Sequence, residues 1–190
     1  MLQWLAMAPL PALGLSPAAL ERAVAVAHGA MAGTTAGQAY VPRFFTAVEW
    51  PTVRLLADLV VPRDARSGSA SDAGVPEFMD FVVAEYPVHQ VPVRGGLAWL
   101  DRESRARHGA AFIGCTAAQH TGLLDDIAYP KRARPAMQPG VAFFNRFRDL
   151  VLSGFWSSKV GVEDLRYLGN TFVTQWTGCP PEVLAHLRVR

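Results

Sequence analysis

The chain has 190 residues, of which 51% are hydrophobic and 18% are charged, and its 18 Lys and Arg nearly balance its 16 Asp and Glu. This length and composition suit one ordinary domain and exclude a mainly disordered chain, because the sequence can bury a hydrophobic core. The basic residues are scattered along the chain rather than gathered into a phosphate-binding surface, so we expect no nucleic-acid partner.

The first 42 residues differ from the rest, since only Glu21 and Arg22 are charged there. Residues 1–20 are apolar and rich in Ala and Leu, and their three prolines argue against a membrane-spanning helix. Small-x-small sequences follow at 25–27 and 30–32, a pattern that an export signal peptidase recognises. No basic region precedes the apolar stretch, so two interpretations stay open: a start codon further upstream, or a buried N-terminal extension.

Residues 29–38 are rich in Gly, Ala and Thr, and we expect a flexible linker there. The sequence thus divides into an export-signal-like segment with its linker, over residues 1–42, and a helical domain over residues 43–190.

In the second segment, apolar residues recur at helical spacing, and capping boxes, prolines and glycines mark where helices begin and end. The predicted helices run from the Thr46 capping box to Pro62, from Pro76 through Tyr86, from Gly96 to His108, from the Thr116 capping box to Pro130, from Phe143 to Gly154, and, as short helices, over Val162–Leu168 and Pro181–Leu187. No stretch alternates convincingly as a strand would. We therefore predict an all-α, compact single-domain fold of about five to seven helices with long ordered loops.

One loop is unusual, because residues 63–74 are small and polar although strong helices flank them. Such a loop is either mobile or held by a specific contact.

The sequence offers little for catalysis or ligand binding. The five histidines lie far apart, the adjacent carboxylates Asp125 and Asp126 point in different directions on a helix, and Ser157 and Ser158 lack a recognisable His or acid partner. A strand-borne, glycine-rich phosphate loop is also missing. We predict no catalytic residue, no cofactor-binding residue and no metal ligand in this chain.

Cys115 and Cys179 are the two cysteines, and each lies where a helix is predicted to begin or end. In an oxidising compartment we expect them to form a disulfide, which would stabilise the fold by about 4 kcal/mol on the chain-entropy estimate. In the cytosol they would be two thiols.

Several stretches together carry a family resemblance. They are LVVPRD at 59–64, SGSASDAGVPEFMD at 67–80, GLAWLD at 96–101, FF at 143–144 with RDL at 148–150, GFWSS at 154–158 with Gly161, and YLGN at 167–170. In their order and spacing, from about Phe44 to Pro180, they resemble the small subunit, subunit 3 or gamma, of the gluconate 2-dehydrogenase type.

The resemblance implies a non-catalytic subunit in an obligate heterodimer with a large FAD-dependent sugar or polyol dehydrogenase of the glucose-methanol-choline type. FAD, the substrate pocket and the catalytic base would belong to that partner. In similar systems the small subunit carries a twin-arginine signal and escorts the folded flavoprotein to the periplasm, where a cytochrome c subunit often takes the electrons onward at the membrane. The expected Arg-Arg pair is absent after Met1, and we expect it upstream.

This role predicts that the partner orders the polar segments, which bury too little apolar area to order themselves. The predicted partner-interface residues are Asp64, Ser67, Ser69, Asp72, Gly74, Gly154, Phe155, Trp156, Ser157, Ser158, Gly161, Tyr167 and Asn170. The alternative from another class is a stand-alone exported helical binding protein. An enzyme acting alone would need a catalytic constellation that the sequence does not reveal.

Overall fold

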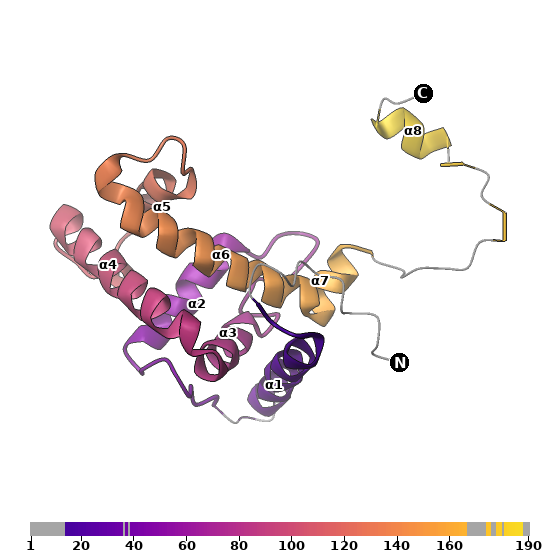
Figure 1. Cartoon of the computed structure of the whole chain (residues 1–190), viewed down its shortest axis with the longest axis horizontal. Coiled ribbons are helices and arrows are strands. Elements are labelled where there is room, and N and C mark those ends of the chain that lie inside the picture. Colours follow the sequence, from indigo (N-terminus) through magenta and orange to yellow (C-terminus); the bar gives the residue numbers. More distant parts are fainter. Residues whose placement is uncertain are drawn as a thin grey trace.

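The computed structural model describes residues 14–35, 37, 39–166, 174–175, 178–179 and 181–187. These residues form eight α-helices and no strand (Figure 1), which confirms the all-α prediction. The helices are α1 (Pro17–Thr35), α2 (Glu49–Val60), α3 (Val75–Glu85), α4 (Gln90–His108), α5 (Ala117–Ala128), α6 (Gln138–Ser157), α7 (Lys159–Asp164) and α8 (Pro181–Leu187).

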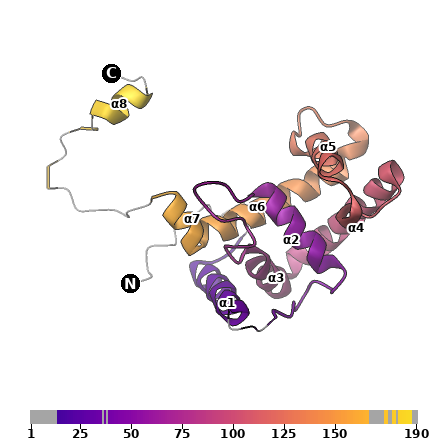
Figure 2. The same cartoon turned by 180° about the vertical axis from the view of Figure 1, so that it is seen from behind.

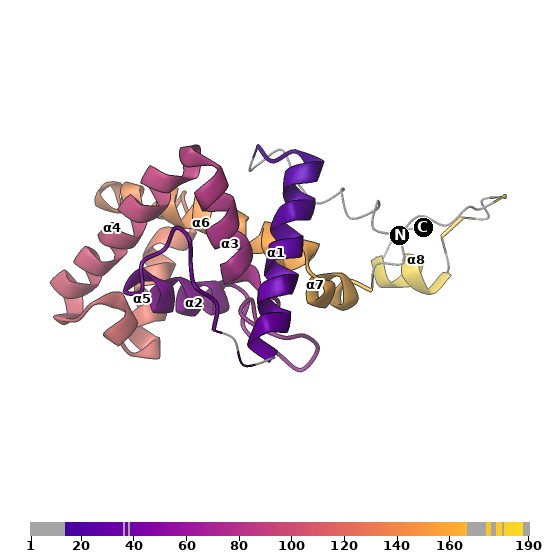
Figure 3. The same cartoon turned by 90° about the horizontal axis from the view of Figure 1, so that it is seen from below.

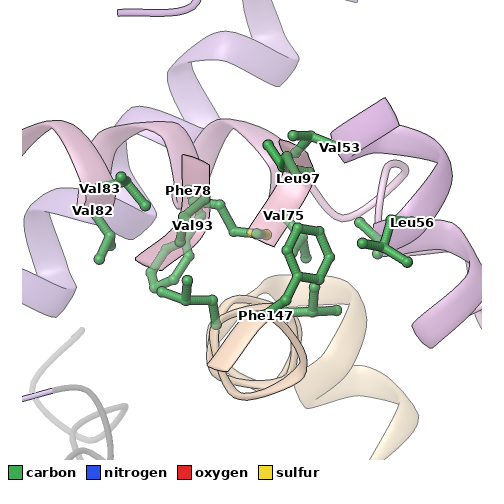
Figure 4. Packing of buried hydrophobic residues seen from close by; sticks show 14 of the residues in the cluster. Val53, Leu56, Val75, Phe78, Val82, Val83, Val93, Leu97 and Phe147 are labelled. Atoms are coloured by element: carbon green, nitrogen blue, oxygen red, sulfur yellow. The ribbon is translucent and has the colours of Figure 1, made fainter. Parts of the chain in front are cut away.

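Helix α3 lies at the centre, because every residue from Val75 to Val83 is buried. It packs against α1, α2 and α6, and α6 in turn packs against α4, α5 and α7 (Figures 1 and 3). Side chains from α2, α3, α4 and α6 meet in this core, including Leu56, Phe78 and Phe147 (Figure 4). Burial of these apolar side chains is the main favourable contribution to folding.

The predicted capping boxes are present. At the start of α5, the Thr116 N–H donates to Gln119 Oε1 over 2.8 Å, and the Gln119 N–H donates to Thr116 Oγ1 over 3.3 Å. Thr46 and Glu49 exchange the same pair of hydrogen bonds ahead of α2. These local bonds satisfy backbone donors that a helix start leaves without partners, which is why the sequence located both helices.

Several helix ends differ from the prediction. Helix α4 begins at Gln90 rather than Gly96, because Pro92 falls in its first turn, where a missing N–H is not needed. Helix α6 begins at Gln138 rather than Phe143 and continues past Gly154 to Ser157. Gly154 serves close packing there instead of ending the helix, since a Cβ on it would lie 2.8 Å from Cδ1 of Phe78. Helix α7 correspondingly begins at Lys159 rather than at Val162.

Helix α1 corrects the expected linker, since residues 29–35 are helical. The buried residues of this region are Leu15, Ala19, Leu20, Ala23 and Ala27. They recur at helical spacing, and α1 makes an extensive contact with α3 (Figure 3). Helix α1 therefore packs with the other helices, although it lies in the segment 1–42 that was predicted to be separate from the helical domain. This arrangement agrees with the interpretation of a buried N-terminal extension. Residues 1–13 lie outside the described residues.

Candidate partner interface

The loop between α2 and α3 is held by its own hydrogen bonds. Asp64 Oδ1 accepts the N–H groups of Arg66 over 2.7 Å and Ser67 over 2.8 Å. These bonds hold the pKa of the Asp64 carboxyl below its usual range. Further along, the Ser69 N–H donates to Asp72 Oδ2 over 2.6 Å, and the Asp72 N–H donates back to Ser69 Oγ over 3.3 Å.

The same loop is tied to α2 and to the core. The Ser71 N–H donates to Asp58 Oδ1 over 2.7 Å, and the Ala70 N–H donates to the Val61 carbonyl over 2.9 Å. Ala70 is fully buried. The loop is therefore held by specific contacts rather than mobile, and these contacts come from the chain itself.

The turn between α6 and α7 is also held by hydrogen bonds within the chain. Ser158 Oγ donates to the Phe155 carbonyl over 2.7 Å and accepts the Gly161 N–H over 3.0 Å, so it caps α7. Gly161 is required by close approach, because a Cβ there would lie 2.1 Å from the Phe155 oxygen. Most of this turn is buried, whereas Trp156 is half-buried and Lys159 is exposed.

The two predicted interface segments come together in space. The Arg66 guanidinium donates to Asp164 Oδ1 over 2.8 Å and to the Asp164 carbonyl over 3.1 Å, which joins the α2–α3 loop to the end of α7 (Figure 2). Gly154 packs on Val75 at the beginning of α3, directly after the loop. Residues 63–74 and 154–164 therefore form one region beside the N-terminal end of α3.

Within this region, only some of the predicted residues are accessible. Asp64 is exposed, and Ser67, Asp72 and Trp156 are half-buried. The buried residues are Ser69, Gly74, Gly154, Phe155, Ser157, Ser158 and Gly161. Tyr167 and Asn170 lie outside the described residues. Four of the predicted residues are thus accessible in this chain and seven are buried within it, and the interface stays a prediction for all of them.

Asp80 is the key polar residue that sequence reasoning missed. It is fully buried on α3 and accepts four hydrogen bonds, from the Tyr40 hydroxyl over 2.8 Å and from the N–H groups of Arg43, Phe44 and Phe45 over 2.7, 2.9 and 3.0 Å. These bonds fix the segment before α2 onto α3. Burial and the neighbouring Asp80 carboxylate raise the pKa of Tyr40. A carboxylate inside an apolar helix stripe is the sequence signal that could have identified it.

Glu77, one turn before Asp80, is a second buried carboxylate. Only 3% of the residue is exposed, and its Oε1 accepts a hydrogen bond from Arg54 over 3.2 Å. Its Oε2 has no hydrogen-bond partner among the described residues. Burial, which penalises the charged form, raises the pKa of Glu77.

Groups suited to metal or thiol chemistry are dispersed. Within residues 14–35 and 39–166 and the short described stretches beyond, no three His, Cys, Asp or Glu residues lie close enough to hold a metal ion. His120 Nε2 is 2.7 Å from the Phe112 carbonyl in the core. Cys115, half-buried, and Cys179, exposed, are separate thiols here, so the disulfide stays a prediction. None of the described helices has the length and apolar character needed to cross a membrane.

A family model for gluconate 2-dehydrogenase subunit 3 matches residues 47–176. The chain belongs to this family. Membership makes it a small, accessory subunit in a gluconate 2-dehydrogenase-type oxidoreductase complex, with other subunits of that complex as partners. The matched range contains α2 to α7, whereas α1 and α8 lie outside it. No curated protein and no solved structure matches the chain significantly.

Proposed function

We propose that this chain is the non-catalytic small subunit of an FAD-dependent sugar or polyol dehydrogenase of the glucose-methanol-choline type. It stabilises the large flavoprotein subunit and accompanies it through twin-arginine export into the periplasm. FAD and the groups that oxidise the substrate belong to the partner. The observation that carries the proposal is the family match over residues 47–176.

The hydrogen bonds of three polar side chains support a structural, non-catalytic role for this chain. Asp80 holds the segment before α2, Asp64 holds its own loop, and Ser158 caps α7. Each of these distinctive groups forms hydrogen bonds within this chain, and those bonds maintain its shape. A chain of this kind can present a defined surface to a partner at little entropic cost on binding.

The export part of the proposal rests on the sequence, namely the apolar N-terminal stretch, its small-x-small sites and the resemblance. Because α1 packs on α3, the sites at 25–27 and 30–32 lie on a helix of the folded assembly. Recognition by a signal peptidase would need that helix to unfold locally.

The test is co-expression with the flavoprotein subunit, whose gene is sought first among the neighbours of this one. With this chain present, we expect soluble, yellow dehydrogenase that reduces a dye with sugar; without it, we expect the yield of flavin-loaded enzyme to fall. Cell fractionation provides a separate readout of export, because dehydrogenase activity should move to the periplasm. Sugar-dependent dye reduction by this chain alone would refute the proposal, and a colourless single species would favour the stand-alone binding protein.

A further inference from the structure

One edge of the molecule carries apolar side chains that the fold leaves in water. Val41, Val48, Val88 and Val91 are 78, 83, 67 and 81% exposed, and we call them the valine edge. Single exposed apolar residues are common on protein surfaces, but a group of them on adjoining segments marks an interaction site more often.

Two arginines bring the segments of the valine edge together. Arg94 on α4 donates to the Phe44 carbonyl over 2.8 Å and pairs with Glu49 over 3.3 Å. Val48 adjoins Glu49, and Val91 is one helical turn before Arg94, so both valines flank this pair. In Figure 1, the segment that leads into α2 passes beside the first turns of α4.

The second arginine, Arg43, brings together the two segments that carry Val41 and Val88. Arg43 pairs with Glu85 at the end of α3 over 3.0 Å, and its guanidinium lies 5.8 Å from the centre of the Phe81 ring. Val41 is two residues before Arg43, and Val88 is three residues after Glu85. The valine edge therefore follows the line where residues 41–49 meet the end of α3 and the beginning of α4.

A groove opens at this edge between α2 and α4. It has a volume of about 220 Å³ and is lined by Val48, Glu49, Thr52, Arg94, Leu97, Ala98 and Asp101. Small-molecule sites usually have volumes of roughly 300–1,000 Å³, so this groove suits a single large side chain better than a cofactor. Apolar anchors of protein interfaces typically enter pockets of this kind.

The charges around the groove indicate which side chains would suit it. Glu49 and Asp101 contribute two carboxylates and Arg94 one guanidinium, which leaves one excess negative charge. Arg94 is already paired with Glu49. Asp101 Oδ1 accepts the Phe112 N–H over 2.9 Å, while its Oδ2 is 3.9 Å from Arg105 in a long ion pair at the surface. A basic side chain beside an apolar one would thus complement this groove better than an acidic one.

We infer that the valine edge and this groove form the docking surface for the large subunit of the complex. The partner places an apolar side chain, flanked by Lys or Arg, in the groove between α2 and α4. This inference rests on the proposed function and adds the place on the chain where the large subunit binds. It also moves the interface away from the residue 63–74 loop, where the N–H groups of Arg66, Ser69 and Ser71 donate to carboxylates of this chain.

The decisive experiment compares two surfaces in the co-expressed complex. The double variant Val48→Asp, Val91→Asp places two charges on the valine edge, and we expect the affinity for the flavoprotein to fall by at least about tenfold. Leu165→Asp is the matched control, because Leu165 is 55% exposed beside the Arg66–Asp164 contact, on the other candidate surface. We expect this control to bind as the wild type does.

The outcomes separate the inference from the proposed function. Wild-type affinity of the double variant, or loss of binding by Leu165→Asp instead, would overturn the docking surface while the subunit role stands. Failure of the wild-type chain to bind the flavoprotein would overturn both. If the double variant misfolds, a photo-crosslinking residue at Val48 replaces it: a covalent adduct with the large subunit supports the inference, and its absence alongside an adduct from position 165 contradicts it.

Discussion

Replacement of Asp80 tests how the fold is held together at its centre. The carboxylate is fully buried and accepts one hydroxyl and three backbone N–H groups. Hydrogen bonds to a charged acceptor contribute about 1.5–3 kcal/mol each, but donors near the surface can turn to water when the acceptor is lost. We therefore expect Asp80→Ala to lower the free energy of unfolding by about 3–5 kcal/mol, and Asp80→Asn, which keeps one acceptor oxygen, by about 2 kcal/mol.

Urea unfolding of the purified chain measures this loss. With a slope of about 2 kcal/mol/M, a loss of 4 kcal/mol shifts the midpoint by about 2 M. Asp125→Asn is the control, since Asp125 is an exposed carboxylate on α5 and its replacement should change stability by less than about 0.5 kcal/mol. A loss below about 1 kcal/mol for Asp80→Ala would refute the argument that this carboxylate organises residues 40–45.

Three further predictions follow from the packing and from the buried charge. Gly96→Ala should destabilise the chain by about 1–3 kcal/mol, because the added Cβ would lie 1.8 Å from a phenylalanine ring of α6. Gly95→Ala is the control: its Cβ would enter open space, and the better helix propensity of Ala should stabilise the chain by up to about 1 kcal/mol. The urea midpoints of the two variants test this difference. Because burial raises the pKa of Glu77 in the folded chain above its ordinary value of 4.5, the contribution of this residue to stability is complete below that value. It is lost as the pH rises through the raised pKa. Glu77→Gln should therefore stabilise the chain at pH 7 relative to the wild type and reduce the decline with pH, and equal pH profiles would contradict this. Ala23→Asp should unfold or aggregate the chain, because Ala23 is fully buried on α1, while exposed Ala25→Asp should leave thermal unfolding unchanged; equal behaviour would show that α1 does not contribute to the fold.

The sequence was sufficient for features that depend on neighbouring residues. The capping boxes at Thr46 and Thr116 close within one turn, and the apolar stripes of α3 and α6 repeat at helical spacing, so both could be found without tertiary information. Family membership likewise followed from several short motifs in order, and the family match over residues 47–176 confirms it.

The sequence was insufficient where distant residues meet. Alanines at small-x-small spacing are typical of a signal peptide, but they also let a helix pack closely, and only the contact with α3 revealed α1. Composition alone predicted a loop at residues 63–74 that cannot order itself. The hydrogen bonds of this loop to Asp58 and Val61 cannot be inferred from composition. Asp80 was missed because its partners precede it by 35 to 40 residues.

The valine edge could not be predicted from the sequence either. Its four residues come from two stretches about forty residues apart, and each valine alone fits an ordinary helix start or turn. Their exposure and their common location appear only once Arg43 and Arg94 are seen to join the segments.

The central claim is that this chain acts as the accessory subunit of a flavin-dependent dehydrogenase. The most direct measurement is the mass and absorption spectrum of the species that co-purifies with a tagged copy of the full chain from its native cells. We expect one complex that contains this chain and a large flavoprotein in equal amounts, with a flavin spectrum bleached by the sugar substrate. A colourless species that contains this chain alone would contradict the account.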